Sequence, residues 1–448
     1  MNPHVNTITA RLSLRPPQRD SLELLARLAD KIPLKKERDL AAVLEAVKAE
    51  VPGFTDFERD FPSLCFALAT GVGKTRLMGA FISYLHLARG IRHFFVLAPN
   101  LTIYSKLIAD FTPNSPKYVF QGIAEFSANP PEIITGDNYE TGRATRQDDL
   151  FGPIQVNIFN ISKINAEVRG GNVPKIKDLK EYLGQSYFDY LAGLDDLVLL
   201  MDESHRYRAK AGMRAINELK AVLGIELTAT PKIQSGQNAQ DFKNVVFRYV
   251  LADALKDGFV KEPAVVTREN FDPPPYKERP EELDRIKLED GVGLHEITKV
   301  ELEVYARQNN QPVVKPFVLV VARTTEHADQ VEKIIKSEAF FGGRYKDKVI
   351  TVHSNQSGEV EDETLRRLLD VEKAEEHTEI VIHVNKLGEG WDVTNLYTIV
   401  PLRAFTAEIL TEQTLGRGLR LPYNGQRTGV PAVDRNRPAT PCGVRDAT

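Results

Sequence analysis

Short, continuously apolar runs alternate along this chain with longer segments in which apolar residues recur at helical spacing. The runs include HFFVLAP, DLVLLM, FVLVVA and IVIHV, and runs of this kind suit strands that are covered on both faces. One helical segment begins at Lys74 and ends near Gly90, a residue type that commonly stops helices. The pattern predicts an α/β fold of mainly parallel sheets flanked by helices.

The apolar runs fall into two groups, and each group is able to form its own sheet. We expect strands near 64–68, 94–98, 118–120, 154–159, 197–201 and 225–228 in the first group, and near 317–322, 348–353, 379–384 and 397–402 in the second. A stretch with few apolar residues, which includes DPPPYKERPEELDR, separates the groups. The predicted organisation is a first lobe over 1–265 with a polar insertion at about 128–190, a linker or connecting helix over 266–312, a second lobe over 313–430 and an irregular tail over 431–448.

Charge and cysteine content narrow the classes of function. The chain has 58 basic and 62 acidic residues and a formal net charge of −4, which excludes a globally polybasic nucleic-acid binder but allows a local basic groove. The two cysteines, Cys65 and Cys442, fit a reducing compartment and do not have zinc-ligand spacing. No apolar run approaches the roughly 18 residues of a membrane span, and the first residues do not have the pattern of a signal peptide. We therefore expect a cytoplasmic protein with no membrane association.

The stretch ALATGVGKT follows the first apolar run and has the residues of a phosphate-binding loop. Gly71 and Gly73 allow backbone N–H groups to approach anionic oxygens, Lys74 suits the β- and γ-phosphates, and the Thr75 hydroxyl suits Mg²⁺. Leu68 stands where the usual pattern has its first glycine, so the loop is a shortened form. The alternative interpretation is an ordinary glycine-rich turn.

In the stretch VLLMDESHRYR, two acidic residues, Asp202 and Glu203, directly follow an apolar run. Ligands bind at the carboxyl ends of strands in parallel sheets. Asp202 would hold Mg²⁺ and Glu203 would orient and deprotonate an attacking water, while His205 would sense the neighbouring segment. The alternative is a solvated acidic strand end.

The ordered set LATGVGKT, MDESH, LTATP, GEGWDV and QTLGRGLR resembles the motifs of superfamily 2 helicases of the DExH type. More narrowly, LRPPQRDSLELL, NKLGEGWDVTNLYTIVPLR and LTEQTLGRGLRLPY look like the restriction (Res) subunit of type III restriction–modification enzymes. The motifs run from about residue 11 to residue 434. This resemblance implies two RecA-like lobes with ATP and Mg²⁺ in a cleft between them.

The resemblance also implies site residues. Nucleotide contacts are expected from Thr70, Gly71, Val72, Gly73, Lys74, Thr75, Arg76, Gln18, Gly390 and Asp392, and metal contacts from Thr75 and Asp202. The catalytic set is expected to be Glu203, Asp202, Lys74, Arg417, Arg420 and Gln413.

The chemistry of three of these residues suits the implied roles. A glutamine amide such as that of Gln18 is able to read an adenine edge, although a surface glutamine at a helix start is an equal alternative. Arg417 and Arg420 are spaced to share a helical face and would act as arginine fingers on the transferring phosphoryl group. The alternative for the arginines is a solvated basic helix face.

Further contacts are expected at two other motifs. Thr228 and Thr230 of LTATP would relay the nucleotide state to the nucleic acid, unless this segment is simply a strand-to-turn exit. Arg323 and Thr324 would contact backbone phosphates, and a helix-capping threonine explains the same residues more simply. Trp391 is expected to pack in the core.

These observations predict an ATP-dependent DNA translocase or helicase motor that acts on double-stranded DNA beside a methyltransferase (Mod) subunit. Nuclease activity is not supported, because the E-x-K candidate Glu218 to Lys220 lies in a helical pattern, and we expect a product truncated before the nuclease domain. The alternatives are a general superfamily 2 DNA or RNA helicase, a catalytically incomplete nucleotide-binding remnant, and a phosphate-loop kinase.

Overall fold

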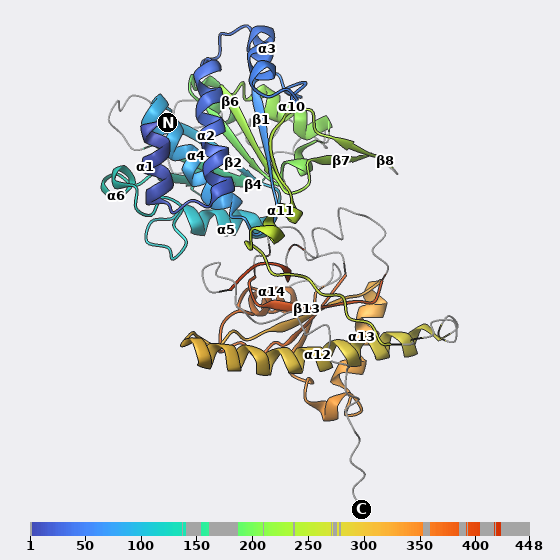
Figure 1. Ribbon diagram of the computed structural model, residues 1–448. Coiled ribbons are helices and arrows are strands. Elements are labelled where there is room, and N and C mark those ends of the chain that lie inside the picture. The colour runs from blue at the N-terminus through green and yellow to red at the C-terminus, as the bar shows by residue number, and fades with distance from the viewer. Residues whose placement is uncertain are drawn as a thin grey trace, which may run out of the picture. The chain divides into compact units, whose positions relative to one another are not determined.

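The computed structural model describes residues 2–136, 138–139, 154–160, 187–208, 210–235, 238–269, 271, 276, 279–352, 359–384, 391, 393–403, 416 and 418–422. The chain divides into two compact units, and the main boundary lies between Ala254 and Leu255 (Figure 1). The sequence placed the end of the first lobe at 265. The boundary lies inside the short helix α11 (Leu251–Lys256).

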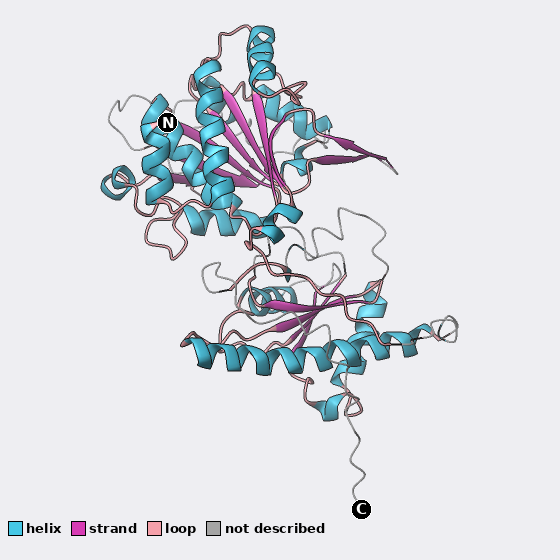
Figure 2. Cartoon of the chain, in the orientation of Figure 1, coloured by secondary structure: helices cyan, strands magenta, loops and turns pink. Residues whose placement is uncertain are grey.

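The first unit contains a parallel sheet of seven strands in the order β3-β4-β2-β5-β6-β1-β9. Figure 2 shows the strands of this sheet among the helices of the unit. The strands are β1 (Ser63–Leu68), β2 (His93–Ala98), β3 (Glu132–Thr135), β4 (Gln155–Asn160), β5 (Val198–Asp202), β6 (Leu223–Thr228) and β9 (Val245–Tyr249). Every residue of β1, β4, β5 and β6 is buried, as the continuous apolar runs predict for strands covered on both faces. A separate antiparallel pair, β7 (Lys232–Ser235) and β8 (Asn238–Asp241), follows β6.

Helices cover both faces of this sheet. They are α1 (Pro3–Arg11), α2 (Pro16–Lys31), α3 (Leu40–Glu50), α4 (Lys74–Arg89), α5 (Leu101–Phe111), α6 (Ala124–Ala128), α9 (Tyr187–Gly193) and α10 (Lys210–Glu218), with a 3-10 turn at Ser204–Tyr207. On one face, Tyr187 and Ile216 pack with Leu199 of β5, and on the other, Phe81 of α4 packs on Phe66 of β1. Helices α1 and α2 pack on α4 and form an outer layer (Figure 1).

The second unit contains a parallel sheet of four strands in the order β11-β12-β10-β13. Its strands are β10 (Phe317–Val321), β11 (Val349–Val352), β12 (Ile380–His383) and β13 (Leu396–Pro401), and its helices are α12 (Pro280–Asn309), α13 (Thr325–Lys336) and α14 (Glu359–Leu369), with a 3-10 turn at Phe341–Gly343. Leu288 and Val292 of α12 and Val331 of α13 pack on one face of the sheet. Among the described helices, none combines the length and the apolar character that crossing a membrane requires.

One predicted strand is wrong. Residues 118–120 form no strand; Val119 and Phe120 are buried in turns, where Phe120 packs on Phe111 and Phe126. Within the region 128–190, the predicted strand near 154–159 is β4, and β3 is a strand that was not predicted; both belong to the main sheet.

Helix α12 lies within the stretch 266–312, which was expected to be a linker or connecting helix, and it packs on β13 of the second unit. Gly291 lies so close to β13 that an added Cβ would meet Val400 Cγ2 at 2.3 Å.

A buried charge network joins the central strands of the first unit. Glu226, in the middle of β6, is fully buried, and its carboxylate accepts hydrogen bonds from Arg59 Nε (3.3 Å), Arg208 Nη2 (2.6 Å) and Ser63 Oγ (2.8 Å). Burial alone would raise the pKa of Glu226, but the two guanidinium groups hold it below its usual range. The ionised carboxylate therefore holds together residues from before β1, from β1, from β6 and from the segment after β5.

Glu226→Ala should lower the free energy of unfolding by about 3–5 kcal/mol, because Arg59 and Arg208 lose a shared buried partner. Urea denaturation followed by circular dichroism measures the change. The matched control is Arg214→Ala, which removes an exposed ion pair with Glu218 and should cost less than about 1 kcal/mol. Equal costs for the two variants would contradict a stabilising network.

Candidate nucleotide site

The candidate site lies at the carboxyl ends of three neighbouring strands of the first unit. Strand β6 lies between β5 and β1, and the parallel register pairs Asp202 with Leu227 and Ala67 with Thr228. The segments that leave these strands are therefore adjacent, although they are distant in the sequence. This is the edge at which open α/β sheets bind ligands.

The loop from Ala69 to Gly73 turns the chain from β1 into α4. Gly71 and Gly73 have φ angles of 85° and 96°, in the left-handed region that favours glycine. The Val72 side chain is fully buried, and Ala69 N donates to Tyr249 O of β9 at 2.9 Å. The loop is thus held from two sides, and the first N–H groups of α4, from Lys74 onward, lie at its end, as in helix-terminal phosphate sites.

Helix α2 contacts the same loop through Arg15 and Gln18. Gln18 Oε1 accepts a hydrogen bond from Arg15 N at 2.8 Å, and Gln18 Nε2 donates to Gly73 O at 2.9 Å. Arg15 Nη1 donates to Gly71 O at 3.0 Å. Gln18 is 2% exposed, so the alternative of a surface glutamine is wrong, while its role in reading adenine stays a prediction.

Lys74 and Glu203 meet across the site. Lys74 Nζ lies 3.3 Å from Glu203 Oε1, and the two side chains are 11% and 19% exposed. Glu203 has a φ of 48°, an uncommon left-handed conformation for a residue with a side chain. The pair joins the phosphate loop to the end of β5, so the two motifs that the sequence singled out form one site.

Asp202 is the most buried acid of the site, with 8% exposed. Burial and the adjacent Glu203 charge raise the pKa of Asp202 to about 6. Within the described part of the chain it forms no salt bridge, and its Oδ1 accepts from Glu203 N at 3.1 Å. The buried Asp202 carboxylate at the end of β5 and the half-buried Thr75 hydroxyl at the start of α4 are oxygen donors of the kind that Mg²⁺ prefers.

His205 connects this pair of acids with the end of β6. Its Nδ1 lies 3.2 Å from Thr228 Oγ1 and 3.7 Å from Glu203 Oε2. Thr228 Oγ1 in turn accepts from Thr230 N at 3.1 Å. The contacts bring together the MDESH and LTATP segments, which suits the expected relay.

Several site predictions from the second half of the chain fall outside the described residues. These are Gln413, Arg417, Gly390 and Asp392. Arg420 is half-buried, and Trp391 is 3% exposed, as expected for a core residue.

Three other candidates have structural roles. Thr324 caps α13 by accepting from His327 N at 3.2 Å, and Arg323 is ion-paired with the buried Asp284 of α12. Glu218 is the last residue of α10 and pairs with Arg214, whereas Lys220 lies beyond the end of the helix with a φ of 51°.

The sequence analysis missed Arg15 and Arg208 as residues that support the site. Arg15 could have been identified from its position, because it lies three residues before Gln18 and directly precedes the two prolines at the start of α2. The signal for Arg208 was the lone Glu226 within the apolar strand β6, since a buried carboxylate requires a charged partner.

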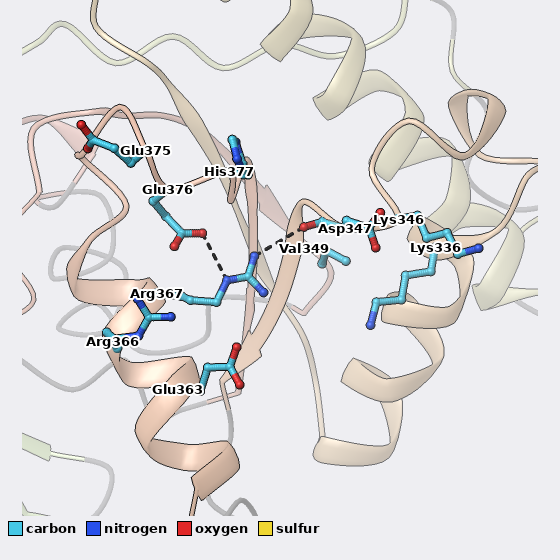
Figure 3. Close-up of a pocket in the computed structure, with 10 residues that line it drawn as sticks. All are labelled: Lys336, Lys346, Asp347, Val349, Glu363, Arg366, Arg367, Glu375, Glu376 and His377. Atoms are coloured by element: carbon cyan, nitrogen blue, oxygen red, sulfur yellow. Dashed lines mark hydrogen bonds and ion pairs between the residues drawn. The ribbon is translucent and has the colours of Figure 1, made fainter.

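A separate cavity lies in the second unit. Its volume is about 410 Å³, and Figure 3 shows that charged side chains line it. Arg367 crosses it to pair with Glu376 at 3.1 Å, and Asp347 and His377 precede β11 and β12. The cavity therefore lies at the amino ends of these strands, where its four acidic and four basic residues balance each other.

The chain is similar in sequence to known restriction-enzyme proteins. Residues 11–233 match the family model described as type III restriction enzyme, res subunit. The chain is 23% identical over 407 residues to the type I restriction enzyme EcoKI endonuclease subunit of Escherichia coli K12, a match that covers 83% of this chain and 32% of the relative. It is 28% identical over 189 residues to a Haemophilus influenzae Rd protein described as the HindVIP Res subunit of a type III restriction-modification enzyme, covering 38% of this chain and 32% of that protein.

These matches are similarities to restriction-enzyme subunits, and they include the segment that carries the phosphate-loop and DES motifs. A solved structure with the same fold is the ATP-dependent Type ISP restriction-modification enzyme LlaBIII bound to DNA, at a TM-score of 0.55 and 16% identity, covering 92% of this chain and 27% of that one. The chain thus has the RecA-like α/β fold that the motif order implied. The chain spans 32% of the length of the two curated relatives.

Gly73→Ala should disrupt the loop from Ala69 to Gly73, because an added Cβ would lie 2.6 Å from Gln18 Nε2. The matched control is Gly90→Ala, which also has a positive φ (73°) but has no atom within 4 Å of its added Cβ. Both variants should lose about 1 kcal/mol of stability from backbone strain, and only Gly73→Ala should weaken the binding of an ATP analogue in calorimetry. Loss of binding in both, or in neither, would contradict this account of the loop.

Proposed function

We propose that the chain is the motor of an ATP-driven DNA translocase or helicase that resembles the Res subunit of type III restriction enzymes. The observation that supports this most strongly is the 3.3 Å contact between Lys74 of the phosphate loop and Glu203 at the end of β5. A lysine for phosphates and a carboxylate for water belong to phosphoryl-transfer sites of this fold. The DNA-bound, ATP-dependent enzyme with the same fold adds support.

In this proposal the residues of the first unit divide the chemistry of hydrolysis. Lys74 would leave Glu203 for the β- and γ-phosphates, and the backbone N–H groups of the loop would hold the remaining oxygens. Glu203, released from the lysine, would orient the attacking water and accept its proton.

Thr75 and Asp202 would hold Mg²⁺, which supplies positive charge against the phosphates when it is bound. Because the pKa of Asp202 is raised to about 6, this carboxyl would be partly protonated in mildly acidic solution and would hold the ion best above that pH.

The proposal extends to the second unit and to partners. Arg417 and Arg420 would neutralise charge on the transferring phosphoryl group, Gln413 would assist them, and Gly390 with Asp392 would approach the ribose. Double-stranded DNA would be the track, in the cytoplasm, and a Mod-type methyltransferase would supply site recognition. We assign no nuclease activity to the residues of this chain.

ATP turnover should rise several-fold with double-stranded DNA and should fall by at least about 100-fold in Lys74→Ala and Glu203→Gln, since each removes a group that acts on the transferring phosphoryl or its water. A phosphate-release assay with double-stranded DNA, single-stranded DNA and RNA measures this. Lys35→Ala and Glu125→Gln, at exposed positions of the same unit, are the matched controls.

Stronger stimulation by RNA would instead favour a general superfamily 2 helicase. Equal, slow turnover in the parent and in Lys74→Ala would show a nucleotide-binding remnant.

A further inference from the structure

Two residues from the start of α2 hold the phosphate loop at two points. Arg15 Nη1 donates to Gly71 O at 3.0 Å, and Gln18 Nε2 donates to Gly73 O at 2.9 Å. The two carbonyls flank Val72, whose side chain is fully buried. The contacts are reinforced from within α2, because Gln18 Oε1 is fixed by Arg15 N.

Peptide geometry connects these contacts with the phosphate-binding groups. In a trans peptide the carbonyl of one residue and the N–H of the next point in opposite directions. A Gly71 carbonyl held toward α2 therefore directs the Val72 N–H away from α2, and a Gly73 carbonyl does the same for the Lys74 N–H. Within the loop, Val72 N donates to Ala69 O at 3.5 Å, and Gly73 O also accepts from Leu77 N at 3.2 Å, so Arg15 and Gln18 act on peptides that the turn and the first turn of α4 also hold.

We propose that Arg15 is a positioning residue that orients the phosphate loop for a triphosphate, whichever base the nucleotide has. The proposal rests on the proposed function only in taking a triphosphate as the ligand of the loop. Arg15 suits this task, because its guanidinium remains charged and donates several hydrogen bonds from a planar group. A group that acts through backbone carbonyls affects the phosphate part of a ligand, whereas a group that reads the base does not.

The first test compares ligands that share the triphosphate and differ in the base. Arg15→Met should weaken the binding of ATP, GTP and inorganic tripolyphosphate by the same factor, about tenfold to a hundredfold, as for loss of a hydrogen bond from a charged donor. Arg15→Lys should recover part of the affinity. The matched control is Arg19→Met on the same helix, whose side chain is 48% exposed and pairs with Asp20, and it should bind all three ligands like the parent.

Weaker binding of ATP with unchanged binding of tripolyphosphate would overturn the proposal and assign Arg15 to the base. Isothermal titration calorimetry on the full chain gives these affinities.

The second test needs no ligand and separates this proposal from the proposed function. Hydrogen–deuterium exchange should be faster in peptides covering 69–76 of Arg15→Met than in the parent or in Arg19→Met, while exchange across the rest of α2 stays unchanged. Unchanged exchange at 69–76 would overturn the positioning role. If exchange at 69–76 is faster in Arg15→Met than in the parent, but the parent has no DNA-stimulated ATP turnover, the proposed function is contradicted and the positioning role of Arg15 stands.

Discussion

The order of three parallel strands is the constraint on which the candidate site depends. Strand β6 lies between β1 and β5, and each pair is in parallel register, so the three carboxyl ends share one edge of the sheet. Lys74 follows β1 and Glu203 follows β5, and this arrangement brings their charged atoms to 3.3 Å. The buried network around Glu226 ties the same strands together below the site, which links the stability of the sheet to the geometry of the edge.

The phosphate loop depends on its surroundings as well as on its glycines. Positive φ at Gly71 and Gly73 allows the tight turn, but the turn leaves backbone carbonyls that need partners. Arg15 and Gln18 supply two of them from α2, and Tyr249 O accepts from the loop on the side of β9. An outer helix layer and an edge strand therefore define the loop together with the residues of the motif itself.

Much of the fold could be predicted from local patterns. Buried runs marked β1, β2, β5 and β6 to within two residues, because strands covered on both faces need continuous apolar sequence. The helix from Lys74 ends at Arg89 with Gly90 as its cap, as its spacing and glycine indicated.

Local sequence patterns gave incomplete predictions where contacts between residues distant in the sequence determine the structure. Val119 and Phe120 are apolar and buried but belong to turns, where Phe120 packs on Phe126. The polar composition of α12 suggested a connecting helix, whereas Leu288 and Val292 on one of its faces pack in the core of the second unit. Within the site, residue types indicated Lys74, Asp202 and Glu203. No local sequence pattern predicts the hydrogen bond from Arg15 to Gly71 O, because this bond depends on how α2 packs on α4.

A crystal structure of the chain with Mg²⁺ and a non-hydrolysable ATP analogue tests the central claim most directly. The account predicts phosphate oxygens against the backbone of 71–75, Lys74 moved from Glu203 to the phosphates, and the ion between Thr75 and Asp202. An analogue bound elsewhere, with Lys74 still paired to Glu203, would contradict it.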